Sequence, residues 1–325
     1  MDFSKILLMV TVPALLLASC AKENADGESA SMEFSVKTKG AGISVPDNTN
    51  QLVRLYVGVN GKEHAGVDDK QEHIHLHTTA DLTDGYSFLV TGLTERRYKM
   101  AFICVPKIDG MLTMDASKLQ CDYNAVIVDF SPILDKQPSA NMEDIGHIYR
   151  KVISRHASSG KQAMENVILD RINGQLVIDM GILEDQFENK VEKIEVIFNN
   201  LPTSIYLRDN DNAEIITARQ NPNKVYTSIP DLSPAAKKLH HRIILNLLPS
   251  NLNGVIRVTE QGKAAKDYKI GGTYGGGKVS VKPNTRTILE FNGLHRDYFT
   301  VKYAGFDGSS IGVDDDQWDG WENIQ

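Results

Sequence analysis

The sequence lacks the features of several common functional classes. It has three cysteines in 325 residues, which allow at most one disulfide, and aromatic residues make up only 7%. Its formal net charge is −7, so the chain has no general basic surface for nucleic acid. No serine, cysteine or paired-carboxylate arrangement stands in a catalytic context. We therefore predict that the chain is not an enzyme, has no cofactor and binds no nucleic acid.

The first apolar run has the pattern of an export signal. Lys5 precedes the apolar residues 6–17, and small residues follow up to Cys20. This order is typical of a secretory signal peptide, and no later run is apolar enough for a transmembrane helix. Leu17-Ala18-Ser19-Cys20 resembles the bacterial lipobox, in which the peptide is cut before the cysteine and the thiol is diacylated. The alternative is an ordinary signal peptide with a cysteine at the cut.

A lipid on Cys20 would hold the chain on a membrane without a transmembrane helix, because two acyl chains anchor a protein stably. Residues 20–31 are small and polar and include three acids, so they predict a flexible leash. Lys22-Glu23 resembles the signal that sends lipoproteins of Bacteroidales-type bacteria to the outer face of the outer membrane, although a solvated linker explains these residues as well. We expect a surface-exposed protein that is lipid-anchored to the cell outer membrane.

The rest of the chain has the pattern of β-strands separated by turns. Apolar and polar residues alternate, and helical periodicity is confined to short turns at 115–119, 142–145 and 234–240. The polar segment 154–163 is the clearest boundary, and roughly 300 residues favour two domains. We therefore predict an all-β chain: a signal peptide at 1–19, a leash at 20–31, a β-sandwich at 32–153, a linker at 154–163, and a second β-sandwich with an acidic, tryptophan-containing tail at 164–325.

Three short motifs give the chain a family resemblance. Residues 167–178 (VILDRINGQLVI) are similar to the strand that opens the second domain of the fimbrillins, or type V pilins. Residues 245–250 (LNLLPS) and Asp316-Gln317-Trp318 resemble further segments of that superfamily, the last one in its fimbrillin-associated anchor subunits of the minor fimbrium. The resemblance implies two tandem transthyretin-like β-sandwiches. It also implies a fimbrial subunit that binds other subunits by donor-strand exchange and supports cell adhesion.

The first predicted strand separates an anchor from a shaft subunit. The resemblance implies that in shaft fimbrillins a protease cuts after an arginine behind this strand, and that a neighbour's strand then fills the groove. Here residues 33–52 contain no arginine, and the first arginine is Arg54, inside the next strand. Phe34 and Val36 are expected in the core beside the strand at 52–59, and the first strand is expected to cover an edge of the sheet. We therefore expect a retained first strand and an anchor that limits fibre length. A polymerising shaft or tip subunit is the alternative.

Histidines form a weak candidate metal site. His73, His75 and His77 alternate along a predicted strand, so their imidazoles would face one side, as Zn²⁺ binding requires. A solvated polar face explains the same pattern, and we predict no metal. His240 and His241 have no partner in the sequence and are expected on the surface.

The remaining cysteines and the C-terminal tail complete the candidates. Cys104 and Cys121 border apolar strands and either form a disulfide, which a location outside the cytoplasm permits, or are buried free thiols. Trp318 and Trp321 lie in an acidic tail and are candidate contacts with a partner. The same tryptophans, with exposed tyrosines, also fit a second kind of function, a glycan-binding surface lipoprotein of the outer membrane.

Overall fold

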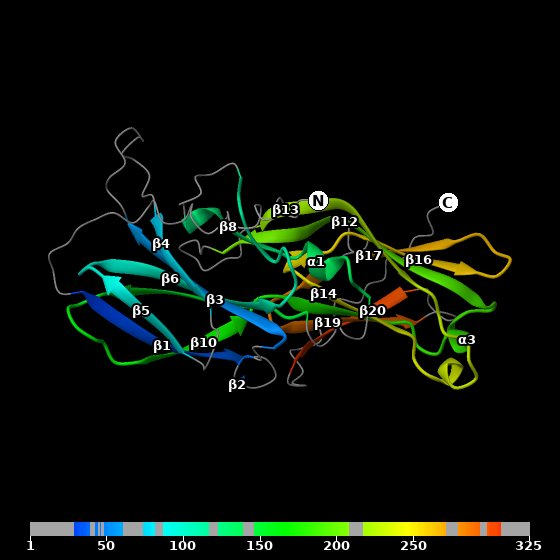
Figure 1. Ribbon diagram of the computed structural model, residues 1–325. Helices are drawn as coiled ribbons and strands as arrows, with labels where there is room; N and C mark the ends of the chain where they lie inside the picture. The colour runs from blue at the N-terminus through cyan, green and yellow to red at the C-terminus, as the bar shows by residue number, and fades with distance from the viewer. Residues whose placement is uncertain are drawn as a thin grey trace, which may run out of the picture.

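The computed structural model describes residues 29–39, 43–44, 46, 49–60, 74–81, 87–116, 123–138, 146–207, 217–270, 279–292 and 298–306. In these ranges the chain is mostly β-strand (Figure 1), which confirms the predicted all-β fold. None of the helices described there has the length and apolar character needed to pass through a bilayer. They are single turns: η2 (Tyr123–Ala125), α1 (Ser131–Leu134), α3 (Leu183–Gln186) and η3 (Ala236–Lys238).

An eight-stranded sheet forms the N-terminal lobe of the described chain. Its order is β2-β1-β10-β9-β6-β3-β4, and β5 pairs with β1 on the same side as β2. The strands are β1 (Ala30–Lys39), β2 (Ile43–Ser44), β3 (Gln51–Asn60), β4 (Ile74–Asp81), β5 (Ser87–Leu93), β6 (Arg97–Pro106), β9 (Tyr149–His156) and β10 (Glu165–Arg171).

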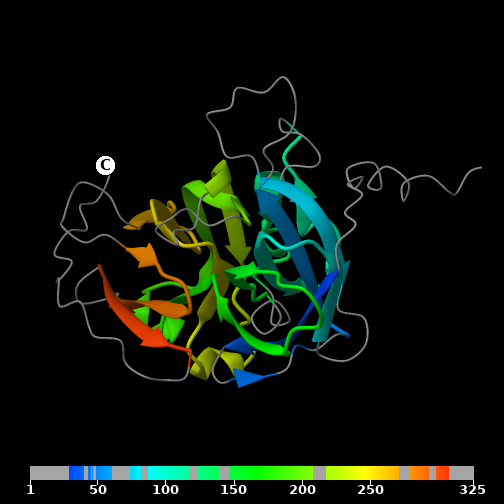
Figure 2. The same ribbon diagram turned by 90° about the vertical axis from the view of Figure 1, so that its left-hand side faces the viewer.

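This sheet curls around its own core (Figure 2). Leu55 on β3 and Phe88 on β5 lie near opposite ends of the strand order, yet both belong to one buried cluster. Phe102 on β6 also belongs to it, and its ring centroid lies 6.0 Å from that of Phe88. Because the two halves of the curled sheet face each other, the lobe has the layered core of a sandwich.

Two sheets enclose the core of the second lobe. The four-stranded sheet has the order β14-β11-β19-β20, and the six-stranded sheet has the order β17-β16-β12-β8-β7 with β13 paired to β12. Tyr268 and Phe291 meet across the two sheets, with ring centroids 5.0 Å apart. The four-stranded sheet contains β11 (Gly174–Asp179), β14 (Arg242–Leu247), β19 (Thr285–Asn292) and β20 (Tyr298–Gly305). The six-stranded sheet contains β7 (Leu112–Met114), β8 (Val126–Asp129), β12 (Val191–Tyr206), β13 (Thr217–Ser228), β16 (Gly254–Glu260) and β17 (Lys266–Ile270), and β15 (Ser250–Asn251) pairs separately with β18 (Ser280–Val281).

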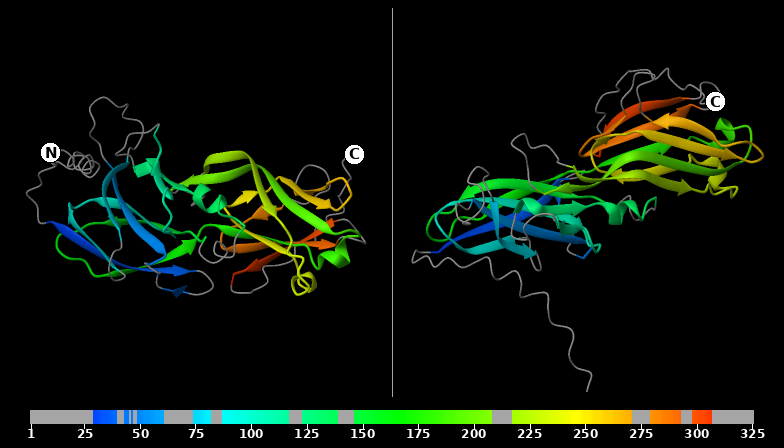
Figure 3. Two further views of the ribbon diagram at one scale, coloured as in Figure 1. Left: turned by 45° about the vertical axis from the view of Figure 1, so that its right-hand side comes forward. Right: turned by 90° about the horizontal axis from the view of Figure 1, so that it is seen from above.

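The two lobes lie end to end and share structural elements (Figure 3). The long strand β12 pairs with β16 through residues 191–198 and with β8 through residues 204–206. Strands β7 and β8 come from the first half of the sequence but complete the sheet of the second half. Ile103 on β6 accordingly belongs to the same buried cluster as Phe299 on β20. The core is therefore continuous between the lobes.

The segment at 154–163, expected to link two sandwiches, lies within one sheet instead. β9 continues to His156, β10 begins at Glu165, and Tyr149 on β9 pairs antiparallel with Arg171 on β10. The polar residues between them form the connection of two neighbouring strands. The division of the chain into two separately folded sandwiches stays a prediction.

The expected helical turns lie only partly within the described residues. At 234–240 the structure has the 3₁₀ turn η3, and the amide of Ala236 donates a hydrogen bond to Ser233 Oγ at 3.4 Å. The turn expected at 234–240 is therefore present but shorter, and its N-cap is Ala235. Residues 117–120 and 139–145 lie outside the described ranges.

Candidate functional site

The first strand, β1, has neighbours on both sides. Its residues 34–39 pair in parallel with residues 165–170 of β10. On its other side, residues 30–35 pair with β5, and Thr38 and Lys39 pair with β2. The expectation that β1 covers an edge is therefore corrected: it is an interior strand. Its removal would leave two unpaired strands facing an open slot, each a template for another chain.

The buried face of β1 packs into the core of the first lobe. The exposed fractions of Phe34 and Val36 are 1% and 0%, which confirms their predicted burial. Both share a cluster with Leu55 of β3, as expected. The Phe34 ring meets Phe102 edge to face, with centroids 5.3 Å apart, a favoured arrangement of two rings. Side-chain packing thus holds β1 in addition to its two hydrogen-bonded ladders.

Contacts from the β9–β10 connection add to this hold. The Ser31 amide donates to the Gly160 carbonyl at 3.1 Å, and the Gln162 amide donates to the Ser31 carbonyl at 3.0 Å. Lys161 forms an ion pair with Glu33 at 3.2 Å. The segment that the sequence marked as a linker therefore fastens the beginning of β1.

The chain passes from the first sheet to the four-stranded sheet through Ile172 and Asn173, both buried. Asn173 Oδ1 accepts a hydrogen bond from the Ile148 amide at 2.9 Å, and its Nδ2 donates to the Gly146 carbonyl at 3.1 Å. Its carbonyl accepts from the Asn284 amide at 3.1 Å. Since both polar atoms of the Asn173 side-chain amide have a partner, the chain crosses between the two sheets in a fixed conformation, which we call the joint.

Gly174 begins β11 directly after this joint. A Cβ at this position would lie 2.3 Å from the carbonyl oxygen of Lys282, which is far inside van der Waals contact. Only glycine lets the two backbones approach this closely. The motif at 167–178 thus covers the last strand of one sheet, the joint and the first strand of the next. The sequence carried this motif but gave no sign of the role of Asn173.

Two arginines and a histidine surround the Phe306 ring beside the joint. The Cζ atoms of Arg171 and Arg286 lie 3.7 and 5.1 Å from its centroid, and the His147 ring lies 5.5 Å away, edge to face. Arg171 is 6% exposed and donates from Nη2 to the Tyr149 hydroxyl at 3.1 Å. Burial lowers the pKa of Arg171. Burial, together with the charges of both arginines, lowers the pKa of His147 to about 3. The cluster is strongly electropositive.

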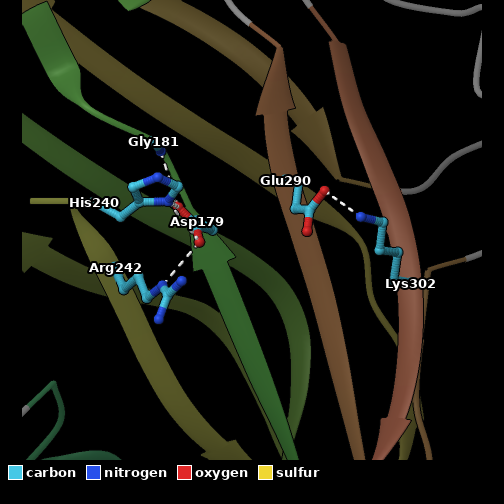
Figure 4. Close-up of polar contacts among 6 residues, drawn as sticks. All are labelled: Asp179, Gly181, His240, Arg242, Glu290 and Lys302. Carbon is cyan, nitrogen blue, oxygen red and sulfur yellow. Dashed lines mark hydrogen bonds and ion pairs between the residues drawn. The ribbon is translucent and has the colours of Figure 1, made fainter. Parts of the chain in front are cut away.

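A second polar cluster pins the far end of β11 (Figure 4). The Asp179 carboxylate accepts hydrogen bonds from His240 Nδ1 at 2.9 Å, Arg242 Nε at 2.8 Å and the Gly181 amide at 2.9 Å. Burial raises the pKa of Asp179, but these hydrogen bonds outweigh burial and hold it below its usual value.

The two adjacent histidines have no partner in the sequence, but the fold gives each of them one. His241 Nε2 lies 3.1 Å from Ser228 Oγ, and burial lowers its pKa. The side chain of His240 is 54% exposed but bound to Asp179. A neighbouring pair, Glu290 and Lys302, lies 2.6 Å apart across β19 and β20 (Figure 4). These contacts fix the β-strands at this end of the four-stranded sheet.

Several predicted site residues fall outside the described residues: Cys20, His73, Cys121, Trp318 and Trp321. Their lipidation, metal-binding, disulfide and partner roles stay predictions. The backbone of His75 and His77 lies on β4. The described ranges contain no group of three metal-binding side chains.

Cys104 is a buried free thiol in the part of the chain that the structure describes. Burial raises its pKa to about 12, so the nucleophilic thiolate is scarce at neutral pH. This environment matches the free-thiol alternative for Cys104.

Comparisons with known proteins found no matching family model and no matching curated protein. Several solved structures are similar in fold at low identity. The fimbrial anchor protein Mfa2 from Porphyromonas gingivalis is 11% identical with a TM-score of 0.47, over 88% of this chain and 99% of that one. A fimbrial assembly protein from Parabacteroides distasonis is 10% identical with a TM-score of 0.44, over 88% and 99%. A Bacteroides thetaiotaomicron protein proposed to bind polysaccharide is 12% identical with a TM-score of 0.49, over 86% and 98%. Fimbrial anchor and assembly proteins are thus among the structures that this chain resembles in fold.

Proposed function

We propose that this chain is a lipid-anchored fimbrial subunit that fixes a fimbrium to the outer membrane and limits its length by retaining β1. It meets other subunits by donor-strand exchange and supports adhesion. The acyl chains on Cys20 hold it on the membrane, and the leash at 20–31 places the β-structure outside it.

The position of β1 is the observation that carries the proposal. A subunit that keeps β1 has no open slot in its first sheet for a neighbour's strand, because β10 and β5 are already paired with β1. An arginine-specific maturation protease would find no arginine between residues 33 and 52. Cleavage at Arg54 would cut inside β3 and damage the sheet. Such a subunit ends a chain of donor strands instead of extending it.

The sequence also left a glycan-binding lipoprotein open. That function needs exposed aromatic rings for stacking on sugars, but seven tyrosine side chains in the described ranges are buried and Tyr206 is only partly exposed. The buried ones are Tyr56, Tyr98, Tyr123, Tyr149, Tyr226, Tyr268 and Tyr303. This observation favours the fimbrial proposal.

The test compares the wild type with a Lys39→Arg variant in fimbriated cells. The substitution keeps the charge of an exposed residue at the end of β1 and adds the missing arginine. We expect wild-type protein to begin at a lipidated Cys20, and the variant to yield a fraction cut after residue 39 together with longer fibres. Deletion of the gene should release fibres from the cell surface. Wild-type protein that begins beyond residue 39 would contradict the proposal.

A Cys20→Ala variant tests the lipid separately. It should leave the membrane fraction if the acyl chains hold the protein there. An unchanged membrane fraction would show that another feature anchors the chain.

A further inference from the structure

The Arg171 guanidinium is buried without the partner that its charge requires. Of its three nitrogens, Nη2 donates to the neutral Tyr149 hydroxyl, whereas Nε and Nη1 are buried and have no hydrogen-bond partner within the described structure. Arg286 donates from Nε to the amide oxygen of Gln175 at 2.9 Å, which is also neutral. His147 Nδ1 is likewise buried without a partner. Buried charges in proteins are normally paired or hydrogen-bonded throughout.

Other arginines of the chain show the usual arrangement. Arg155 binds Glu165, Arg242 binds Asp179, and Arg257 binds both oxygens of Asp267 at 2.7 and 2.8 Å. These three side chains are much more exposed than Arg171. In the described ranges neither Arg171 nor Arg286 forms an ion pair with a carboxylate. Arg171, which is 6% exposed, therefore has no carboxylate partner among the described residues.

We propose that Arg171, Arg286 and His147 form an anion site at the joint between the sheets, and that it binds a carboxylate. A guanidinium offers donors in a planar fork that suits this group. The guanidinium of Arg286 adds a second positive charge, near enough to Arg171 to lower its pKa. The Phe306 ring supplies an apolar wall, which strengthens charge pairing by excluding water. Neighbouring Tyr149 and Gln175 fix the directions of the two arginines.

The carboxylate has two candidate sources. One is this chain: residues 307–325 follow Phe306 directly and contain six acidic residues and no lysine or arginine. The other is a separate molecule. The experiment distinguishes them with a tail-neutral variant, in which all six tail acids are replaced by their amides.

The measurement is the thermal midpoint of the mature chain in sodium acetate and in sodium chloride at equal ionic strength. If the tail fills the site, acetate leaves the thermal midpoint of the wild type unchanged. The tail-neutral variant then has a lower thermal midpoint than the wild type, and acetate raises it by about 2–4 °C. If the ligand is a separate molecule, acetate raises the thermal midpoints of the wild type and of the tail-neutral variant equally. In both cases the Arg286→Gln substitution is added to the protein whose thermal midpoint acetate raises, and it abolishes that rise. A Lys282→Gln control, which removes a nearby exposed charge over Tyr303, keeps it.

Arg286→Gln is the variant of choice because Arg286 is only partly buried, and Arg171→Gln is a second variant to compare if it folds. The proposal is overturned if acetate shifts neither the wild type nor the tail-neutral variant. It is also overturned if acetate still raises the thermal midpoint of the Arg286→Gln variant, since acetate would then stabilise the chain as a general co-solvent and not by binding at this site.

Discussion

Replacing Phe34 with alanine tests how strongly β1 is held in the first lobe. Phe34 is fully buried and its ring packs edge to face on Phe102, which in turn contacts Phe88. Truncation of a buried phenylalanine to alanine costs about 3–5 kcal/mol, because transfer free energy is lost and a cavity remains. The neighbouring strands pair through the backbone of β1, so the ladder itself is unchanged and the loss measures packing alone.

The assay is the urea midpoint of unfolding, followed by fluorescence and circular dichroism. Lys37→Ala is the matched control, because Lys37 is an exposed residue of the same strand. Its effect should stay within about 0.5 kcal/mol. A Phe34→Ala variant as stable as this control would refute the view that β1 is part of the core. If the substitution lets the first lobe unfold at lower urea than the second, the chain has two separable folding units and not one continuous core.

Three further predictions concern the joint and its charges. Gly174→Ala should destabilise the chain by roughly 1–3 kcal/mol, because its Cβ would overlap the Lys282 carbonyl; an unchanged urea midpoint would contradict the close approach. Asn173→Ala should cost roughly 2–4 kcal/mol in the same assay, since the Ile148 amide and a carbonyl would be buried without partners. The pKa of His147 is about 3 in the folded chain and 6.5 in the unfolded chain. Below pH 6.5 the unfolded chain therefore binds a proton that the folded chain does not. The free energy of unfolding then falls by about 1.4 kcal/mol for each pH unit. His147→Gln should make the pH profile correspondingly flatter between pH 6.5 and 4, and an identical profile would show that His147 is not buried neutral.

Strands with clean alternation were predictable from the sequence. β1 and β3 fall where the sequence places the first strand and the strand at 52–59. Burial alternates along β1, because one of its faces meets the core and the other does not. β12 (Val191–Tyr206) is an unusually long strand and contains a proline. Pro202 marks a break in the sequence, but a register shift between Pro202 and Ser204 accommodates it and the strand continues to pair.

β9 was missed because its polar end was taken for a linker. It lies between β10 and β6, and both of its faces are partly covered, Val152 by one cluster and Ile153 by the other. Partial burial on two sides gives no clear alternation. The segment at 154–163 connects β9 and β10 within one sheet, and the chain crosses to the four-stranded sheet only at Ile172 and Asn173.

The candidate sites were predictable only where a local pattern exists. Burial of Phe34 and Val36 follows from alternation along one strand. The parallel pairing of β1 with β10 joins residues about 130 positions apart, as Phe34 and Glu165 show, and no local pattern encodes it. The cluster of Arg171, Arg286 and His147 likewise depends on three distant segments that only the fold brings together.

The N-terminus of protein recovered from fimbriated cells tests the central claim most directly. Mass analysis of the intact chain, with and without removal of ester-linked lipid, reports lipidation and retention of β1 together. Our account predicts a single species that begins at acylated Cys20, contains β1 and is located at the cell-surface end of the fibre. A species without lipid that begins beyond residue 39 and is distributed along the fibre would contradict it.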